Sequence, residues 1–193
     1  MTILLAPVAG VLLGSLDFLW IKYVPFPLGG LGNSSAVWAV AAFLFAYRRR
    51  SVAGSLAGSI VLLVVAVPSY YLTATLVQGD DLANVWSPVW TAFAVIAGLV
   101  FGAAGAVARR TDRWQVAALA VPVAVLFAEA ALHLARPSSD AGDAQHAALV
   151  TALGVLLPLA VAASGKRRAA AIGLAVPIAA AGYGLFRLAG FMW

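Results

Sequence analysis

Residues 53–77 read AGSLAGSIVLLVVAVPSYYLTATLV, an apolar stretch without a single Asp, Glu, Lys or Arg. As a helix, this stretch is long enough to cross the hydrocarbon core of a bilayer, which requires about 20 apolar residues. On either side of it the chain holds six further, predominantly apolar stretches, at residues 3–22, 31–47, 87–108, 115–135, 146–164 and 169–191. The sequence therefore predicts an all-α, polytopic membrane helix bundle with seven transmembrane helices.

The composition excludes a water-soluble globule. Of the 193 residues, 64% are hydrophobic and 10% are charged, whereas soluble domains have about 45–50% apolar and 25% charged residues. Because the segments between the apolar stretches are short, we expect residues 1–193 to form a single integral membrane domain with no soluble catalytic part. The chain has no cysteine and two histidines, too few for a histidine-rich or thiolate metal centre. The sequence accordingly predicts neither a metal nor another cofactor.

The positions of the basic residues predict the orientation. The loops after the second, fourth and sixth stretches carry three Lys or Arg each, at residues 48–50, 109–113 and 166–168. Cytoplasmic loops of membrane proteins are enriched in Lys and Arg, so we expect a cytoplasmic N-terminus and a multi-pass location in a bacterial cytoplasmic membrane. The net charge of +5 is then a topology signal, and no nucleic-acid partner is expected.

Pairs of glycines recur at a spacing of four residues, at Gly10/Gly14, Gly54/Gly58 and Gly98/Gly102. On a helix such pairs lie on one face and allow two backbones to approach closely. The pattern favours packing inside the bundle. Association of two copies of the chain into a homo-oligomer through one such face is the alternative.

Polar and aromatic side chains gather at one depth, in the half of the bundle opposite the arginine-rich loops. Asp17, Glu129 and Arg187 share roughly this depth, and His133 lies one turn beyond Glu129 on the same helix face. The same layer contains Asn33, Trp38, Tyr70, Tyr71, Trp90 and Tyr183. Ionisable groups within a span normally face the bundle interior, where they pair or line a cavity. We therefore expect this layer to hold the functional residues.

Two interpretations of the buried acids remain open. Asp17 or Glu129 could pair with Arg187 and join the first, fifth and seventh helices. Alternatively, desolvation keeps one carboxyl group neutral unless Arg187 holds it ionised, and a protonated carboxyl in an apolar cavity can donate a proton.

Three short segments resemble a family of small actinobacterial integral membrane proteins of unknown function. They are Gly32–Trp38 (GNSSAVW), Val67–Tyr71 (VPSYY) and Phe127–Ala130 (FAEA). In size, span count and its Ala/Val/Gly-rich composition the chain also resembles the small bacterial membrane terpene cyclases that act on indole-linked sesquiterpenes. It shares a seven-span plan with fungal membrane meroterpenoid cyclases, which rely on intramembrane carboxylates. The second likeness implies cofactor-independent cyclisation of a lipophilic substrate.

The leading hypothesis is a proton-initiated cyclase of an isoprenoid-type substrate, an activity of the isomerase or lyase type. Glu129 is the first choice for the catalytic acid and Asp17 the second, while Trp38, Tyr70, Tyr71 and Trp90 would stabilise carbocations. Asn33 and His133 would position the acid, and Arg187 and Tyr183 complete the expected substrate-binding set. Two alternatives remain: a transporter or binding protein for small molecules or protons, and an accessory membrane subunit without catalysis.

Overall fold

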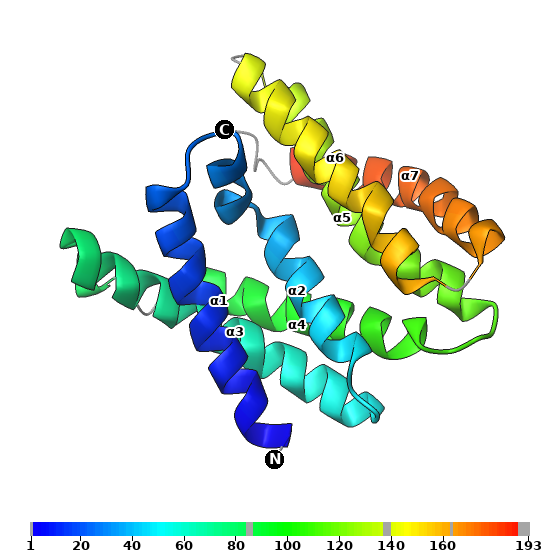
Figure 1. The fold of residues 1–193 in the computed structure, drawn as a ribbon, viewed down its shortest axis with the longest axis horizontal. Helices are drawn as coiled ribbons and strands as arrows, with labels where there is room; N and C mark the ends of the chain where they lie inside the picture. The colour runs from blue at the N-terminus through cyan, green and yellow to red at the C-terminus, as the bar shows by residue number, and fades with distance from the viewer. Residues whose placement is uncertain (1, 84–86, 137–139, 163, 189–193) are drawn as a thin grey trace.

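The computed structural model describes residues 2–83, 87–136, 140–162 and 164–188. Within these ranges the chain is all-helical (Figure 1), and no strand is present in the described part. The elements are α1 (Thr2–Tyr23), η1 (Leu28–Asn33), α2 (Ser35–Tyr47), α3 (Val52–Gln78), α4 (Pro88–Ala108), α5 (Trp114–Leu134), α6 (Ala141–Val161) and α7 (Gly165–Leu188). Six of the helices are long and apolar enough to cross a membrane, and α2 is a shorter apolar helix. The predicted polytopic helical bundle is therefore confirmed.

The second stretch differs from the expected span at 31–47. Its first residues form the short 3-10 helix η1, and α2 then runs for 13 residues, or about 20 Å at 1.5 Å per residue. The break falls at Ser34, whose extended backbone starts α2 and whose side chain accepts a hydrogen bond from the Val37 N–H. Irregular backbone is tolerated at membrane depth where it is buried in protein or lines a cavity, and the break meets both conditions.

Two other helices begin earlier than predicted. Helix α6 starts at Ala141 rather than at 146, because the Asp140 carboxylate accepts hydrogen bonds from the Gly142 and Asp143 N–H groups and caps the helix. Helix α7 starts at Gly165 rather than at 169, so the three basic residues expected in a loop lie in its first turn. The predicted end of α7 at 191 lies outside the described residues.

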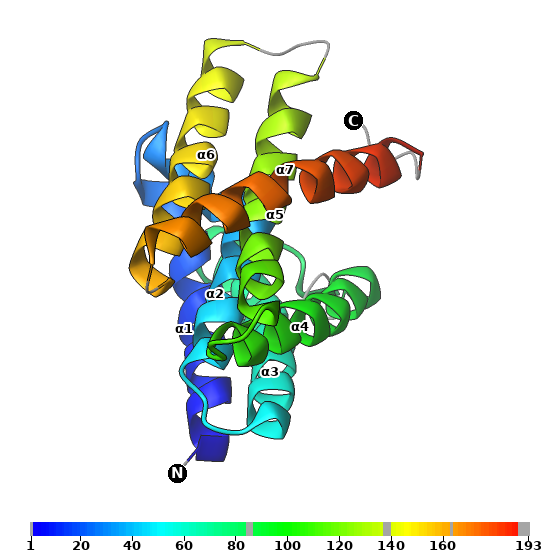
Figure 2. The same cartoon turned by 90° about the vertical axis from the view of Figure 1, so that its right-hand side faces the viewer.

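The helices form two groups (Figure 1). Helix α3 packs against α1 and α4, and α2 against α3 and α4, while α5 packs against α6 and α7; contacts of α5 with α4 and α2 join the groups. Figure 2 shows that α7 lies across α5 rather than alongside it. The largest core cluster includes the fully buried Phe43, Leu63 and Leu119 of α2, α3 and α5.

The outer surface is apolar, as a lipid-facing surface requires. Many large side chains are exposed on the outside of the helices, among them Leu12, Val89, Ile96, Leu156 and Val176. A soluble protein rarely exposes contiguous apolar patches of such extent. The chain is thus a multi-pass membrane protein.

Two of the three glycine pairs hold α3 against its neighbours, and Gly58 of the third pair lies against the Phe45 ring of α2. A Cβ added at Gly10 or Gly14 would collide with the Leu62 or Ala66 carbonyl oxygen of α3, and Gly98 lies equally close to Ile60 of α3. Gly54, by contrast, meets no other helix within 4 Å among the described residues. The glycine faces of α1 and α4 thus position α3 between them.

The arginine-rich segments gather at one end of the molecule. The guanidinium of Arg167, in α7, donates to the Gln115 side chain and to the Thr111 carbonyl, next to the α4–α5 connection. The Tyr47 hydroxyl, at the end of α2, donates to the Val161 carbonyl at the end of α6. This clustering agrees with the alternating charge of the predicted loops.

Candidate functional site

A cavity of about 220 Å³ lies between α1, α2, α3 and α4. Six of the predicted site residues line it: Asp17, Asn33, Trp38, Tyr70, Tyr71 and Trp90. Small and aliphatic side chains such as Ala39, Leu63 and Val67 complete its walls, together with the Phe93 ring. We call it the aromatic cavity. Its acid and its rings come from four helices. The sequence analysis placed these residues at one depth but did not predict which helices are neighbours.

The sequence of α1 places Asp17 in the cavity. Gly10, Gly14 and Asp17 are separated by four and three residues, so they lie on one face of the helix. The two glycines bring that face against the α3 backbone, where Gly14 is packed on Ala66 and on the Tyr70 N–H. Asp17, one turn further on, is therefore directed at the interface with α3, and the residue is only 9% exposed.

Aromatic rings surround the acid in edge-to-face contacts. The Tyr70 ring centroid lies 5.5 Å from that of Phe18, 6.3 Å from Trp38 and 5.4 Å from Tyr71. Such T-shaped pairs fix the ring planes relative to one another, so the cavity is bounded by rings of defined orientation. Trp90, at 49% exposed, stands at its outer edge.

The Asp17 carboxyl has few polar neighbours. The Trp38 side chain lies within hydrogen-bonding reach of it, and no ion pair within the described ranges involves Asp17. The Asn33 side chain lines the same cavity. A charged carboxylate without a cationic partner is costly inside a membrane, so this environment suits a neutral carboxylic acid.

Glu129 lies outside the aromatic cavity, so the expectation that both acids share one chamber is wrong. Its Oε2 accepts a hydrogen bond from the Ala36 N–H at 3.0 Å, and its Oε1 is 3.0 Å from His146 Nε2. Glu129 of α5 therefore satisfies one of the free N–H groups in the first turn of α2.

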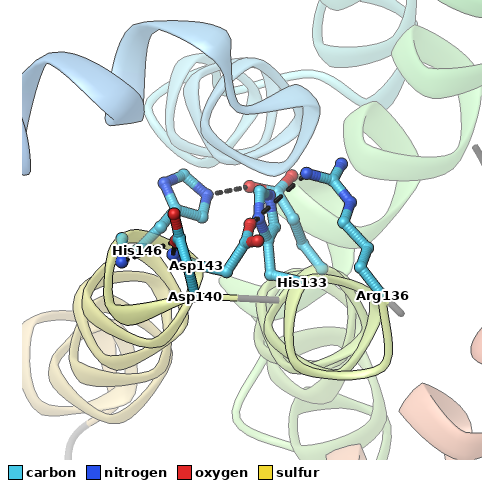
Figure 3. A network of polar contacts seen from close by, with 7 residues as sticks. His133, Arg136, Asp140, Asp143 and His146 are labelled. Carbon is cyan, nitrogen blue, oxygen red and sulfur yellow. Dashed lines mark hydrogen bonds and ion pairs between the residues drawn. The ribbon is translucent and has the colours of Figure 1, made fainter. Parts of the chain in front are cut away.

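A second polar group, which we call the histidine–carboxylate cluster, consists of Glu129, His133, Asp143, His146 and Arg136. His133 Nδ1 is 2.6 Å from Asp143 Oδ1, Arg136 donates to the same oxygen at 3.4 Å, and the two imidazole centroids are 4.2 Å apart. Figure 3 shows the side chains of His133 and Arg136 and those of Asp143 and His146 directed toward one another from neighbouring helices. The cluster borders a cavity of about 580 Å³, which Asn33 and Ile21 also line. Those two residues belong to both cavities.

Arg187 and Tyr183 do not join either site. Arg187 Nη1 donates to the Tyr183 hydroxyl at 3.4 Å, and no ion pair between Arg187 and Asp17 or Glu129 occurs among the residues the structure describes. Helix α7 crosses α5 through Ala175 and Ala179, and its last turns lead away from the polar layer (Figure 2). The first of the two interpretations, in which Asp17 or Glu129 pairs with Arg187 and joins the first, fifth and seventh helices, is therefore wrong.

Sequence reasoning missed three members of the cluster. It gave no role to His146, which begins the expected stretch 146–164, or to Arg136 and Asp143 in the segment before it. His146 is in fact buried and pairs with Glu129, whereas the Asp143 side chain is 17% exposed. The sequence did hold one signal for this pairing. Glu129 and His133 lie near the end of one helix and His146 near the start of the next, antiparallel helix, so the three residues lie at the same end of the bundle.

The comparisons with known proteins show the family and nothing more specific. The model of a family of unknown function (DUF6518) matches residues 1–190, and the chain belongs to that family. No curated protein and no solved structure matches the chain.

Proposed function

We propose that this member of the family is a membrane-embedded cyclase that protonates an isoprenoid-type lipophilic substrate in the aromatic cavity. The observation that carries the proposal is a buried acid, Asp17, with no ion-pair partner among the described residues, on the wall of a cavity lined by Trp38, Tyr70, Tyr71 and Trp90. Proton-initiated cyclisation needs an acid to protonate an alkene or epoxide and rings to stabilise the resulting carbocation. Both requirements are met without a cofactor.

The proposal assigns the proton donor to Asp17 rather than to Glu129. Glu129 Oε2 accepts a hydrogen bond from the Ala36 N–H and Oε1 lies 3.0 Å from His146 Nε2, and Glu129 is separated from the rings by the start of α2. Asp17 faces the rings directly. We therefore assign Glu129 the task of holding the start of α2 in place, and through it the Asn33–Ser35 edge of the cavity.

The chemistry divides among the lining residues in a simple way. Asp17 transfers its proton to a substrate double bond or epoxide oxygen, and the indole N–H of Trp38 steadies the carboxylate that remains. A cation above a desolvated aromatic face gains roughly 0.5–2 kcal/mol, which the Tyr70, Tyr71 and Trp90 rings can supply in turn. Loss of a proton from the final carbocation to the Asp17 carboxylate would close the cycle and regenerate the acid.

The size of the cavity limits what enters it. A volume of about 220 Å³ is below the roughly 300–1,000 Å³ of sites that enclose a whole drug-sized ligand. The reacting end of the chain would occupy the cavity, and the remainder would pass Trp90 into the bilayer. We place the protein in a bacterial cytoplasmic membrane, where such substrates dissolve; association of copies through one of the glycine faces stays a prediction.

The direct test is Asp17→Asn, assayed in membranes with a farnesylated substrate. Because a positioned general acid contributes about 10²- to 10⁴-fold, cyclised product should fall by at least 100-fold. Asp81→Asn is the matched control, since Asp81 lies in the exposed α3–α4 connection and should retain full activity. Unchanged cyclisation by Asp17→Asn would refute the assignment.

A binding or transport role is the second candidate, favoured by the sharing of Asn33 and Ile21 between the two cavities. Against a continuous polar path, the buried Ser55 and Ser59 hydroxyls both donate to α2 carbonyl groups, of Ala46 and Ala42. Uptake of a small amphiphile or of protons into liposomes that Asp17→Asn abolishes, without any cyclised product, would favour transport. Co-purification with a second polypeptide at fixed stoichiometry would instead favour an accessory subunit.

A further inference from the structure

The geometry points to a binding site for a divalent transition-metal ion, with Zn²⁺ as the probe, formed by Glu129, His133 and His146. Each of these residues offers one ligand atom, and the three atoms lie within 4.8 Å of one another. The site departs from the sequence-based expectation of no metal. It is independent of the proposed cyclase chemistry, because none of the three residues lines the aromatic cavity.

The spacing of the ligand atoms suits a tetrahedral ion. Bonds of about 2.0–2.1 Å to nitrogen or oxygen place tetrahedral ligands roughly 3.3 Å apart. Glu129 Oε1 and His146 Nε2 are already 3.0 Å apart, so a movement of roughly 1.5 Å or less by the His133 imidazole would complete the set. Glu129 and His133, at i and i+4 on α5, face the start of α6, where His146 lies.

Asp143 provides the supporting contact that metal-bound histidines usually have. Its Oδ1 lies 2.6 Å from His133 Nδ1, which fixes the proton on Nδ1 and leaves the Nε2 lone pair free to bind a metal. Arg136 holds the same carboxylate from the other side. Hydrogen bonds that only join α5 to α6 would not by themselves require the two imidazole centroids to lie 4.2 Å apart.

The surroundings give an ion access and favour positive charge. His133, Asp140, Asp143 and His146 line the cavity of about 580 Å³, so an ion can reach the ligands from the cavity and keep a water as fourth ligand. Asp143 pairs with Arg136, whereas Glu129 and Asp140 add two further carboxylates near the site, which leaves an excess of negative charge. Two imidazoles and one carboxylate suit Zn²⁺, whereas Mg²⁺ prefers oxygen ligands.

The test uses the full chain purified in detergent with a histidine-free affinity tag and stripped with EDTA. The chain has two histidines and no cysteine, so no other imidazole or thiolate can account for binding. Calorimetric titration should show one equivalent of Zn²⁺ bound with a rise in the unfolding temperature, and no response to Mg²⁺. Tetrahedral Co²⁺ absorption, removed by one equivalent of Zn²⁺, should report the same site on the unmutated chain.

The variants distinguish a metal site from a set of hydrogen bonds that only joins α5 to α6. His133→Gln and His146→Gln should each weaken Zn²⁺ binding by more than tenfold, and Asp143→Asn by about 10- to 100-fold with unchanged stoichiometry. Asp81→Asn should bind as the unmutated chain does. Absence of saturable Zn²⁺ binding by the unmutated chain, or equal binding by His133→Gln, would overturn the proposal. If a histidine variant fails to fold, the Co²⁺ spectrum of the unmutated chain is the test, and absence of tetrahedral absorption would overturn the proposal.

Discussion

Asp17 and Glu129 lie at similar depths in the bundle but have different neighbours. Asp17 faces Tyr70 and Trp38, whereas Glu129 contacts the Ala36 N–H in the first turn of α2 and the His146 imidazole of α6. Depth along a helix follows from the sequence at 1.5 Å per residue. Which neighbours a side chain faces can be inferred only when the arrangement of the surrounding helices is known. This is why the sequence grouped the two acids and the structure separates them.

At the residue scale, the Tyr71 ring tests the role assigned to the aromatic wall. Tyr71→Phe keeps the ring and should cyclise within about twofold of the unmutated rate. Tyr71→Leu removes a cation–π contact of roughly 0.5–2 kcal/mol and should slow product formation by about 2- to 30-fold. Product yield per protein, measured by chromatography in membranes, checks both. Equal rates for the leucine and phenylalanine variants would remove Tyr71 from the mechanism.

Gly14 provides a residue-scale test of the α1–α3 contact. A methyl group there would collide with Ala66 and Tyr70, whereas Gly173 on α7 has nothing within 4 Å in the described part of the chain. Gly14→Ala should therefore lower the free energy of unfolding by about 1–3 kcal/mol through overpacking, and Gly173→Ala should leave it unchanged or slightly raised. Denaturation of the purified protein in detergent measures both. A neutral Gly14→Ala would contradict the close packing.

At the element scale, the start of α2 separates and supports the two sites. Ser34 accepts the Val37 N–H and is 1% exposed; Ser51 caps α3 in the same way but is exposed. Losing a helix cap costs about 0.5–2 kcal/mol, and Ser34→Ala also leaves buried polar groups without a partner. Its unfolding free energy should fall more than that of Ser51→Ala in parallel detergent denaturation. Equal losses of unfolding free energy would show that the Ser34 cap stabilises the protein no more than the exposed Ser51 cap does.

The sequence predicted the existence of the helices better than their ends. Long apolar runs such as 53–77 are evident because a bilayer imposes their length. The first residues of the 31–47 run, Leu31–Asn33, belong to η1 instead of α2, and Gly32 lies there against the Asp17 carbonyl and the Ile21 side chain of α1. The early start of α6 depends on the Asp140 cap. Such tertiary and capping contacts leave no trace in the hydropathy of the sequence, so the helix ends could not be predicted from it.

At the scale of the whole molecule, the lateral order of the helices decides the outcome of the site predictions. Asn33, Trp38, Tyr70 and Trp90 meet around Asp17 because α1 to α4 pack together. Arg187 was predicted at the same depth but lies on α7, which crosses α5 at an angle to the bundle (Figure 2). The depth of each residue can be predicted from the sequence. The crossing of α7 over α5 cannot, because it depends on small side chains that other helices of the chain also carry.

The orientation of the bundle can be tested because the chain has no cysteine of its own. Single cysteines at Ser51, beside the Arg48–Arg50 cluster, and at Asp81, in the acidic connection, report opposite ends. With a cytoplasmic N-terminus, a membrane-impermeant maleimide should label Asp81→Cys in intact cells, and Ser51→Cys only after the cells are opened. The reverse pattern would show that the basic clusters face outward.

The central claim, that a lipophilic chain enters the cavity beside Asp17, is tested most directly by photo-crosslinking. A farnesyl analogue carrying a diazirine at its reacting end would be bound to the protein in membranes, irradiated, and located by mass spectrometry of the peptides. We predict adducts at Asp17 or at the rings of Tyr70 and Tyr71, suppressed by excess unlabelled substrate. Adducts confined to lipid-facing residues such as Val176 on α7, unaffected by competitor, would contradict the account.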